Sequence, residues 1–308
     1  MQVLIFFQFV LILLGVALAQ IDELPPNLRK LSELITEKVK SLEPILADDI
    51  RLLNQTRSKA LPVLQTSQDL WLNRPEISKF SDQVIKLYDK VQKHLLKDVT
   101  VEMEIAASDD MANLIMSSNH TLFPEETKIS QPIVDRTIAN LKHTRLRNYT
   151  TVGLQGNGDN AQNPGHIIII NGPFVENLGN GELAEAILAH EVGHGELAHG
   201  IRDDIGAAFN ILHPELLDPT FTNIATAALS RNLEFEADRF AVEYLLKSKQ
   251  DPRIMVRALK RVAELKSSSR NVTHIYDSHP VLRDRITAVE KIICRQPKLK
   301  YNNPSKSR

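Results

Sequence analysis

The chain has 308 residues, of which 43% are hydrophobic, and its formal net charge is −1 at pH 7. This length fits one large domain with an additional segment. The balance of 37 basic and 38 acidic residues gives no reason to expect nucleic acid or an anionic membrane surface as a partner. A single cysteine excludes an intrachain disulfide, so packing and any bound metal must stabilise the fold.

The first residues have the pattern of a secretory signal peptide. An apolar run over residues 3–16 is followed by Ala17-Leu18-Ala19, a cleavage pattern that predicts a signal peptide over 1–19 and a mature chain from Gln20. The run is short for a membrane span but lacks a basic start, so an uncleaved anchor is the alternative. We expect secretion to the extracellular space or the secretory lumen, with no stable membrane insertion after cleavage. Four glycosylation sequons agree with this: Asn54, Asn119, Asn148 and Asn271.

Residues 20–97 predict a helical N-terminal segment. One helix starts at Pro25-Pro26, a second restarts at Pro44 and runs toward Ala60, and a third follows. The apolar face of the third helix comprises Ile77, Phe80, Val84, Tyr88, Val91 and Leu95. We expect this segment to pack on the rest of the chain; a removable inhibitory prosegment and a partner-binding arm are the alternatives.

The middle of the chain mixes short strands with helices. Alternation over 101–106 predicts a strand, helices are expected at 109–117 and 132–144, and 147–155 is strand-like. Isoleucines over 167–170 predict another strand. The C-terminal part predicts helices at 203–212, 221–247 and 252–266 and from Pro280 to Arg295, then a polar, disordered tail over 296–308. The fold class is therefore α+β and predominantly α-helical.

The stretch from Leu183 to Gly200 contains the pentad His190-Glu191-Val192-Gly193-His194, and its apolar residues recur at helical spacing. Histidines four apart share one face of a helix, where both imidazoles can bind one Zn²⁺. Glu191 lies beside the metal position, where a general base for zinc-activated water belongs. The alternative is a surface helix with two solvated histidines. Glycines next to the histidines indicate close approach of another backbone or of a substrate.

A catalytic zinc requires a third protein ligand. An extended HExxHxxGxxH motif fails, because Leu197 and Gly200 stand where its glycine and histidine belong, and His199 is expected to face solvent or to support a ligand. Glu234 and Asp238 share a face of the helix expected at 221–247. Glu234 can bind the metal, and Asp238 can accept the free N–H of a bound imidazole. A solvated acidic face is the alternative.

The pentad, followed 40 residues after its second histidine by the Glu-x-x-Ala-Asp motif at 234–238, resembles family 48 of the metallopeptidases, which are gluzincins. The resemblance covers about 98–295 and also rests on Asn160-Ala161, Pro164-Gly165, the hydrophobic strand 166–170 and Ser278-His279-Pro280 with Arg285-Ile286. It implies a zincin core with one Zn²⁺ per chain, polypeptide substrates and a small sheet whose edge strand, 166–170, borders the site. His166 departs from the family, which usually has glycine there.

The residues and the resemblance together predict a secreted zinc endopeptidase in which His190, His194 and Glu234 hold zinc and Glu191 is the general base. An extended substrate would pair along 166–170, with contacts from His166, Ile167, Ile168 and Ile169. His279 has three possible roles: a donor to the oxyanion, a fourth zinc ligand that blocks water, or a cap of the last helix.

Two alternatives compete with the peptidase: an inactive binding protein with the same fold, and a zinc-stabilised structural protein. The structural protein is disfavoured, because structural zinc sites normally have four protein ligands. Cys294 is expected to be a buried structural thiol, with a dimer disulfide or a thiol that masks the zinc as alternatives. Arg285 is expected to anchor the structure through a carboxylate.

Overall fold

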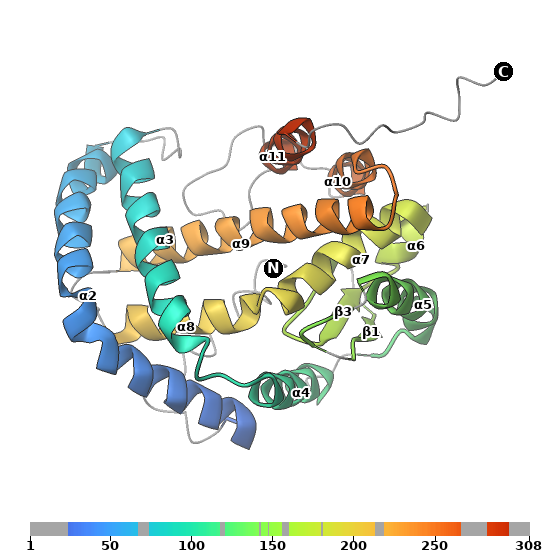
Figure 1. Cartoon of the computed structure of the whole chain (residues 1–308), viewed down its shortest axis with the longest axis horizontal. Helices are drawn as coiled ribbons and strands as arrows, with labels where there is room; N and C mark the ends of the chain where they lie inside the picture. The colour runs from blue at the N-terminus through green and yellow to red at the C-terminus, as the bar shows by residue number, and fades with distance from the viewer. Residues whose placement is uncertain are drawn as a thin grey trace.

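A computed structural model describes residues 24–66, 74–117, 121–141, 143–146, 148–155, 160–179, 181–212, 219–265 and 282–295. The described chain is mostly helical, with one small three-stranded sheet (Figure 1). This agrees with the predicted α+β class. The proposed signal peptide, the tail and His279 lie outside the described residues.

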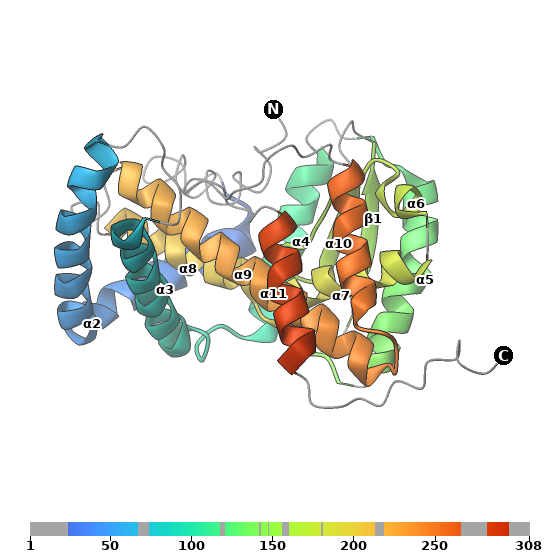
Figure 2. The ribbon, with the colours of Figure 1, turned by 90° about the horizontal axis from the view of Figure 1, so that it is seen from above.

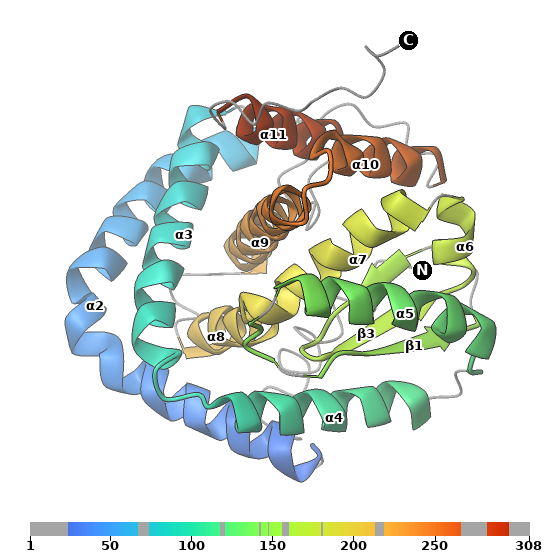
Figure 3. The ribbon, with the colours of Figure 1, turned by 45° about the vertical axis from the view of Figure 1, so that its right-hand side comes forward.

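The N-terminal segment forms two helices, α2 (Pro26–Thr66) and α3 (Pro75–Leu95). The predicted restart at Pro44 is wrong, because α2 continues through it as one helix. An internal proline costs a helix about 3 kcal/mol. Here the apolar face continues past it through Leu46 and Leu53, both 1% exposed, and this burial offsets the cost. Figure 3 shows α2 as two arms that meet at an angle, the bend that an internal proline produces.

Helix α4 (Val101–Ser117) occupies the region where we expected a strand followed by a helix. The strand predicted at 101–106 is wrong, because Val101 and Ile105 are also four apart and fall on one helix face. Both pack against a hydrophobic core. Thr100 caps the helix: its Oγ1 accepts a hydrogen bond from the Met103 backbone N–H at 3.2 Å. Helix α5 (Pro124–Leu141) starts eight residues before the predicted position.

The sheet has the order β1-β3-β2, with β1 (Thr150–Leu154) parallel and β2 (Asn160–Gln162) antiparallel to β3 (Ile167–Asn171). The expectation that the isoleucine strand lies at an edge is therefore wrong. Its four isoleucines are all buried, as is typical of a central strand covered on both faces. Helix α5 packs along β1, and α4 approaches β3 (Figure 3).

The remaining helices are α6 (Phe174–Leu178), α7 (Gly181–Glu196), α8 (His199–Leu212), α9 (Pro219–Lys247), α10 (Arg253–Leu265) and α11 (Leu282–Arg295). Two hydrophobic cores lie along α9. Its first half packs with α2, α3 and α8, and its second half packs with α5, α7 and α10. Helices α10 and α11 lie side by side over α9 (Figure 2).

The burial expected for Cys294 is wrong, because this thiol is exposed on α11 while Ile292 and Ile293 are half-buried and pack against the core. None of the described helices combines the length and apolar character that crossing a bilayer requires.

Candidate metal centre

Helix α7 carries the histidine pair and is held close to its neighbours by two glycines. A Cβ at Gly195 would lie 2.5 Å from the Gly165 carbonyl oxygen and 2.4 Å from the Tyr149 hydroxyl. A Cβ at Gly193 would lie 3.0 Å from the ring of Phe240. The backbone approach predicted from these glycines is present, and it sets the histidine helix against the β2–β3 hairpin.

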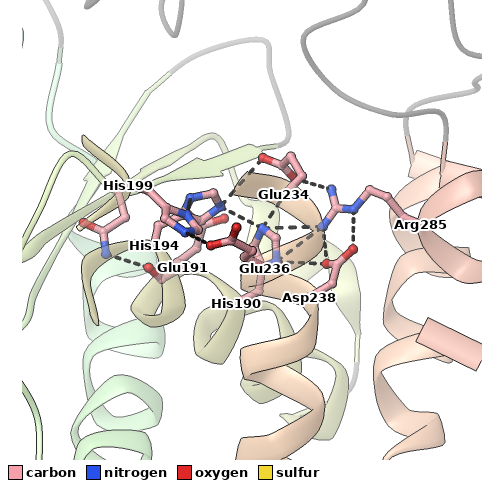
Figure 4. A network of polar contacts seen from close by, with 9 residues as sticks. His190, Glu191, His194, His199, Glu234, Glu236, Asp238 and Arg285 are labelled. Atoms are coloured by element: carbon pink, nitrogen blue, oxygen red, sulfur yellow. Dashed lines mark hydrogen bonds and ion pairs between the residues drawn. The ribbon is translucent and has the colours of Figure 1, made fainter. Parts of the chain in front are cut away.

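Three buried side chains converge beside α7 (Figure 4). The Nε2 atoms of His190 and His194 are 3.1 Å apart. Glu234 of α9 places Oε2 at 3.6 Å from His190 Nε2 and Oε1 at 3.7 Å from His194 Nε2. Within the part of the chain that the structure describes, this is the one group of three such side chains close enough to share a metal ion.

The contacts of the two imidazole rings suit a metal ion. His190 Nδ1 lies 3.0 Å from Asp238 Oδ1, and His194 Nδ1 lies 2.9 Å from His199 Nδ1. These contacts occupy the Nδ1 atoms and leave both Nε2 atoms facing Glu234. Burial lowers the pKa of His194 well below its usual value, with His190 and His199 adding to the shift, so that imidazole is neutral. Two imidazoles and a carboxylate are a donor set of catalytic zinc.

On the His190 side, a charged network surrounds the ligands. Arg285 of α11 contacts Asp238 at 2.6 Å and Glu234 at 2.7 Å. Burial favours the neutral form of Asp238, but the Arg285 charge and the His190 and Arg285 hydrogen bonds outweigh it and lower the pKa. Burial and Arg285 oppose protonation of His190, yet Asp238 and Glu234 outweigh them and raise its pKa. The prediction that Arg285 binds a carboxylate is thus confirmed, and two carboxylates, Asp238 and Glu234, contact it.

On the other side, His199 is 2% exposed, so of its two predicted positions the solvent-facing one is wrong. Burial lowers its pKa to about 4, which keeps the ring neutral at pH 7. Its Nε2 lies 3.6 Å from Glu236 Oε2.

Glu191, which stands between the two histidines in the sequence, is buried. Its backbone oxygen accepts a hydrogen bond from Asn163 Nδ2 at 2.6 Å, which links α7 to the residue after β2. Burial alone would lower the pKa of Arg285. The charges of Asp238 and Glu234 and, more weakly, of Glu191 outweigh burial and raise the pKa of Arg285.

The predicted substrate contacts of Ile167, Ile168 and Ile169 stay a prediction. Strand β1 pairs with all three residues, and β2 pairs with Ile169 on the other side. These residues are 8%, 0% and 2% exposed. His166 is also nearly buried, and its Nε2 lies 3.2 Å from Asp109 Oδ1. His279 lies outside the described residues.

Sequence reasoning missed the supports at the end of α7. Arg145 donates from Nη2 to Glu104 Oε1 at 2.8 Å, and its Nε donates to the Glu196 backbone oxygen at 3.1 Å. Glu196 in turn accepts a hydrogen bond from the Tyr149 hydroxyl at 2.8 Å. The only local signal for this support was the charge of Arg145 just before the strand predicted at 147–155. Its partners lie about 40 to 50 residues away in the chain, so the sequence did not reveal them.

The model of peptidase family M48 matches residues 218–293. The matched stretch includes Glu234, Asp238 and Arg285, which the fold places at the metal centre. The two histidines lie outside the match, yet they converge on Glu234. No curated protein matches the chain.

Proposed function

We propose that this chain, which belongs to metallopeptidase family M48, is a zinc-dependent endopeptidase that hydrolyses extended or unfolded polypeptides. The family implies metallopeptidase activity in general. The observation that carries the finer proposal is the buried convergence of His190, His194 and Glu234 with Glu191 on the same helix. A non-catalytic relative usually loses the glutamate of the pentad, and this chain keeps it.

In this proposal the two Nε2 atoms and the Glu234 carboxylate hold one Zn²⁺ per chain. The chemistry that zinc supplies in such a site is Lewis acidity, which polarises a carbonyl group and lowers the pKa of water. Asp238 fixes the ring orientation of His190 through Nδ1, and Arg285 restrains both Asp238 and Glu234.

Glu191 is proposed as the general base. Its carboxylate takes a proton from the attacking water and passes it to the nitrogen of the leaving amine. The hydrogen bond from Asn163 to the Glu191 backbone supports this role, because it restrains the base against rotation of its helix. His279 remains a proposed oxyanion donor, zinc-blocking ligand or helix cap.

The sheet suggests where a substrate backbone would pair. Since β3 is central, a substrate strand would add to β2, which is at the sheet edge and half-buried. Strand β2 leads directly to Asn163, which contacts α7. A peptide paired with β2 would therefore run past the base. Main-chain pairing of this kind tolerates many side chains, and His166 is a proposed contact.

The test is cleavage of an unfolded protein by the purified mature chain, with and without a chelator. We expect chelation to stop cleavage and added Zn²⁺ to restore it. Glu191→Gln should retain zinc, because Glu191 is not a ligand, and lose nearly all hydrolysis. Zinc-loaded wild-type protein that binds the substrate without cleaving it would support the inactive binding protein instead.

We further propose that the mature chain starts at Gln20 after signal cleavage and acts in the secretory pathway or outside the cell. Exposed Asn54 and Asn148 suit glycosylation. Intact-mass measurement of the protein from secreting cells tests this; a retained N-terminus would support an uncleaved anchor.

A further inference from the structure

A series of polar contacts, buried except at Glu236, leads from the proposed metal ligand His194 to the N-terminal segment. His194 contacts His199, which faces Glu236 of α9 (Figure 4). Arg202 of α8 forms a two-pronged ion pair with Glu236. Arg202 Nε then donates to Gln92 Oε1 of α3 at 2.7 Å. Four helices thus contribute to one connected set of side chains, and α3 lies at its outer end.

Arg202 connects Glu236 to helix α3 in this series of contacts. Its side chain is 9% exposed, and its guanidinium contacts Glu236 from one side and α3 from the other. On α3, Asp89 Oδ1 lies 3.6 Å from Nη2, and Gln92 Nε2 donates to the Arg202 backbone oxygen at 3.5 Å. Gln92 is 3% exposed, so water does not reach Arg202 in place of the Gln92 amide. A buried guanidinium that lost these partners would reorient, because an unsatisfied buried charge is costly.

The contacts also specify where the protons lie. A metal-binding His194 keeps Nε2 free of a proton, so its Nδ1 carries the hydrogen and donates to His199 Nδ1. His199 then carries its own hydrogen on Nε2, which faces the Glu236 carboxylate. Arg202 makes two guanidinium contacts to the same carboxylate, and these hold Glu236 beside the His199 ring. The Glu236 carboxylate is the acceptor that this arrangement needs.

We infer that α3 is part of the metal centre: Gln92 and Arg202 are positioning residues that orient His194 through Glu236 and His199. The inference rests on the proposed function for the role of His194 as a ligand. It also favours an integral N-terminal segment over a removable prosegment, because loss of α3 would strip Arg202 of its partners on that side. The family match, over 218–293, does not include α3.

The decisive variant is Gln92→Leu, which keeps the size and apolar packing of the side chain but removes the acceptor for Arg202. We expect its zinc affinity, measured in competition with a chelator, to fall about tenfold, the lower end of the effect of losing an outer-shell partner. Gln92→Glu retains an oxygen acceptor and should restore most of the affinity. Arg202→Met should lower affinity by at least as much as Gln92→Leu.

The matched control is Val84→Ala, eight residues earlier on α3 and 0% exposed. It loosens the packing of the same helix without touching Arg202, so it should lower the melting temperature while leaving zinc affinity within about twofold. Equal losses of affinity in Val84→Ala and Gln92→Leu at the same melting temperature would overturn the inference. So would unchanged affinity in Gln92→Leu.

A second readout requires neither zinc nor catalysis. The ring nitrogen NMR shifts of His194 in the zinc-free protein report which nitrogen carries the proton. We expect one Nδ1–H form in the wild type and in Val84→Ala, and a mixture in Gln92→Leu. A mixture in the wild type would contradict the inference. A wild-type protein that binds no zinc would instead overturn the proposed function, and the tautomer measurement would still decide the role of α3.

Discussion

His190 and His194 are chemically identical residues one turn apart on α7, yet the molecule supports them in opposite ways. His190 faces a carboxylate, Asp238, that an arginine from α11 holds in place. His194 faces a second neutral imidazole, His199. The pKa is consequently raised for His190 and lowered for His194. Burial opposes protonation of both rings and is the largest contribution in each, but only His190 has a carboxylate beside its remote nitrogen, and the carboxylates outweigh burial there.

Removing the charge that balances the His190 side should give the largest effect. Arg285→Met leaves Asp238 and Glu234 buried without a counterion, and breaking such a pair costs about 3–5 kcal/mol. We expect a clear loss of unfolding free energy in a urea titration. Arg283→Met, which changes an exposed arginine of the same helix, is the control and should stay near wild type. A small loss for Arg285→Met would mean that solvent screens the pair.

Asp238→Ala tests the carboxylate support of His190 directly. We expect zinc to be retained about 10–100-fold less tightly, because the ring loses the acceptor that orients it. Chelator competition measures this. Glu243→Ala, at an exposed position of the same helix, should leave affinity unchanged. Equal metal retention in both variants would contradict a supporting role for Asp238.

His199→Phe tests the neutral support of His194. The expected loss of zinc affinity is at least about tenfold, no smaller than for Gln92→Leu, which acts through His199. It should be smaller than for Asp238→Ala, because a neutral acceptor holds an imidazole less strongly than a carboxylate does. The same chelator competition measures it. A larger loss than in Asp238→Ala would reverse the comparison between the two sides.

The smallest expected effect concerns a buried acid on the His194 side. Burial raises the pKa of Asp203 to about 7, although Arg202 opposes the shift. The folded protein therefore binds a proton between about pH 4 and 7 that the unfolded chain has lost, and stability falls as pH rises through this range. Asp203→Asn should remove this dependence and raise the melting temperature at pH 8 by at least about 2 °C. Parallel stability curves of variant and wild type from pH 4 to 8 would contradict it.

Local patterns predicted the helices that carry the site, because each combines a long apolar periodicity with polar residues at fixed offsets. His190, His194, Glu234 and Asp238 were identified in this way, and they converge as expected. The same patterns failed at 101–106 and at Pro44. Alternation over six residues fits one helix face as well as a strand, and a proline is tolerated when the burial of a long helix outweighs its cost.

The sequence by itself determined that His190 and His194 share one face of α7, because their spacing along one helix places them there whatever surrounds them. Only the tertiary structure decided what supports them. Gln92, Arg202 and Glu236 meet across 34 to 110 residues of chain, and no local pattern encodes such a meeting. Tertiary packing also made the isoleucine strand central, since the partners of a strand come from elsewhere in the chain. The face that a helical residue occupies follows from its spacing along the chain. Which strands pair, and which residues contact the two histidines, depends on how segments distant in the sequence pack against one another.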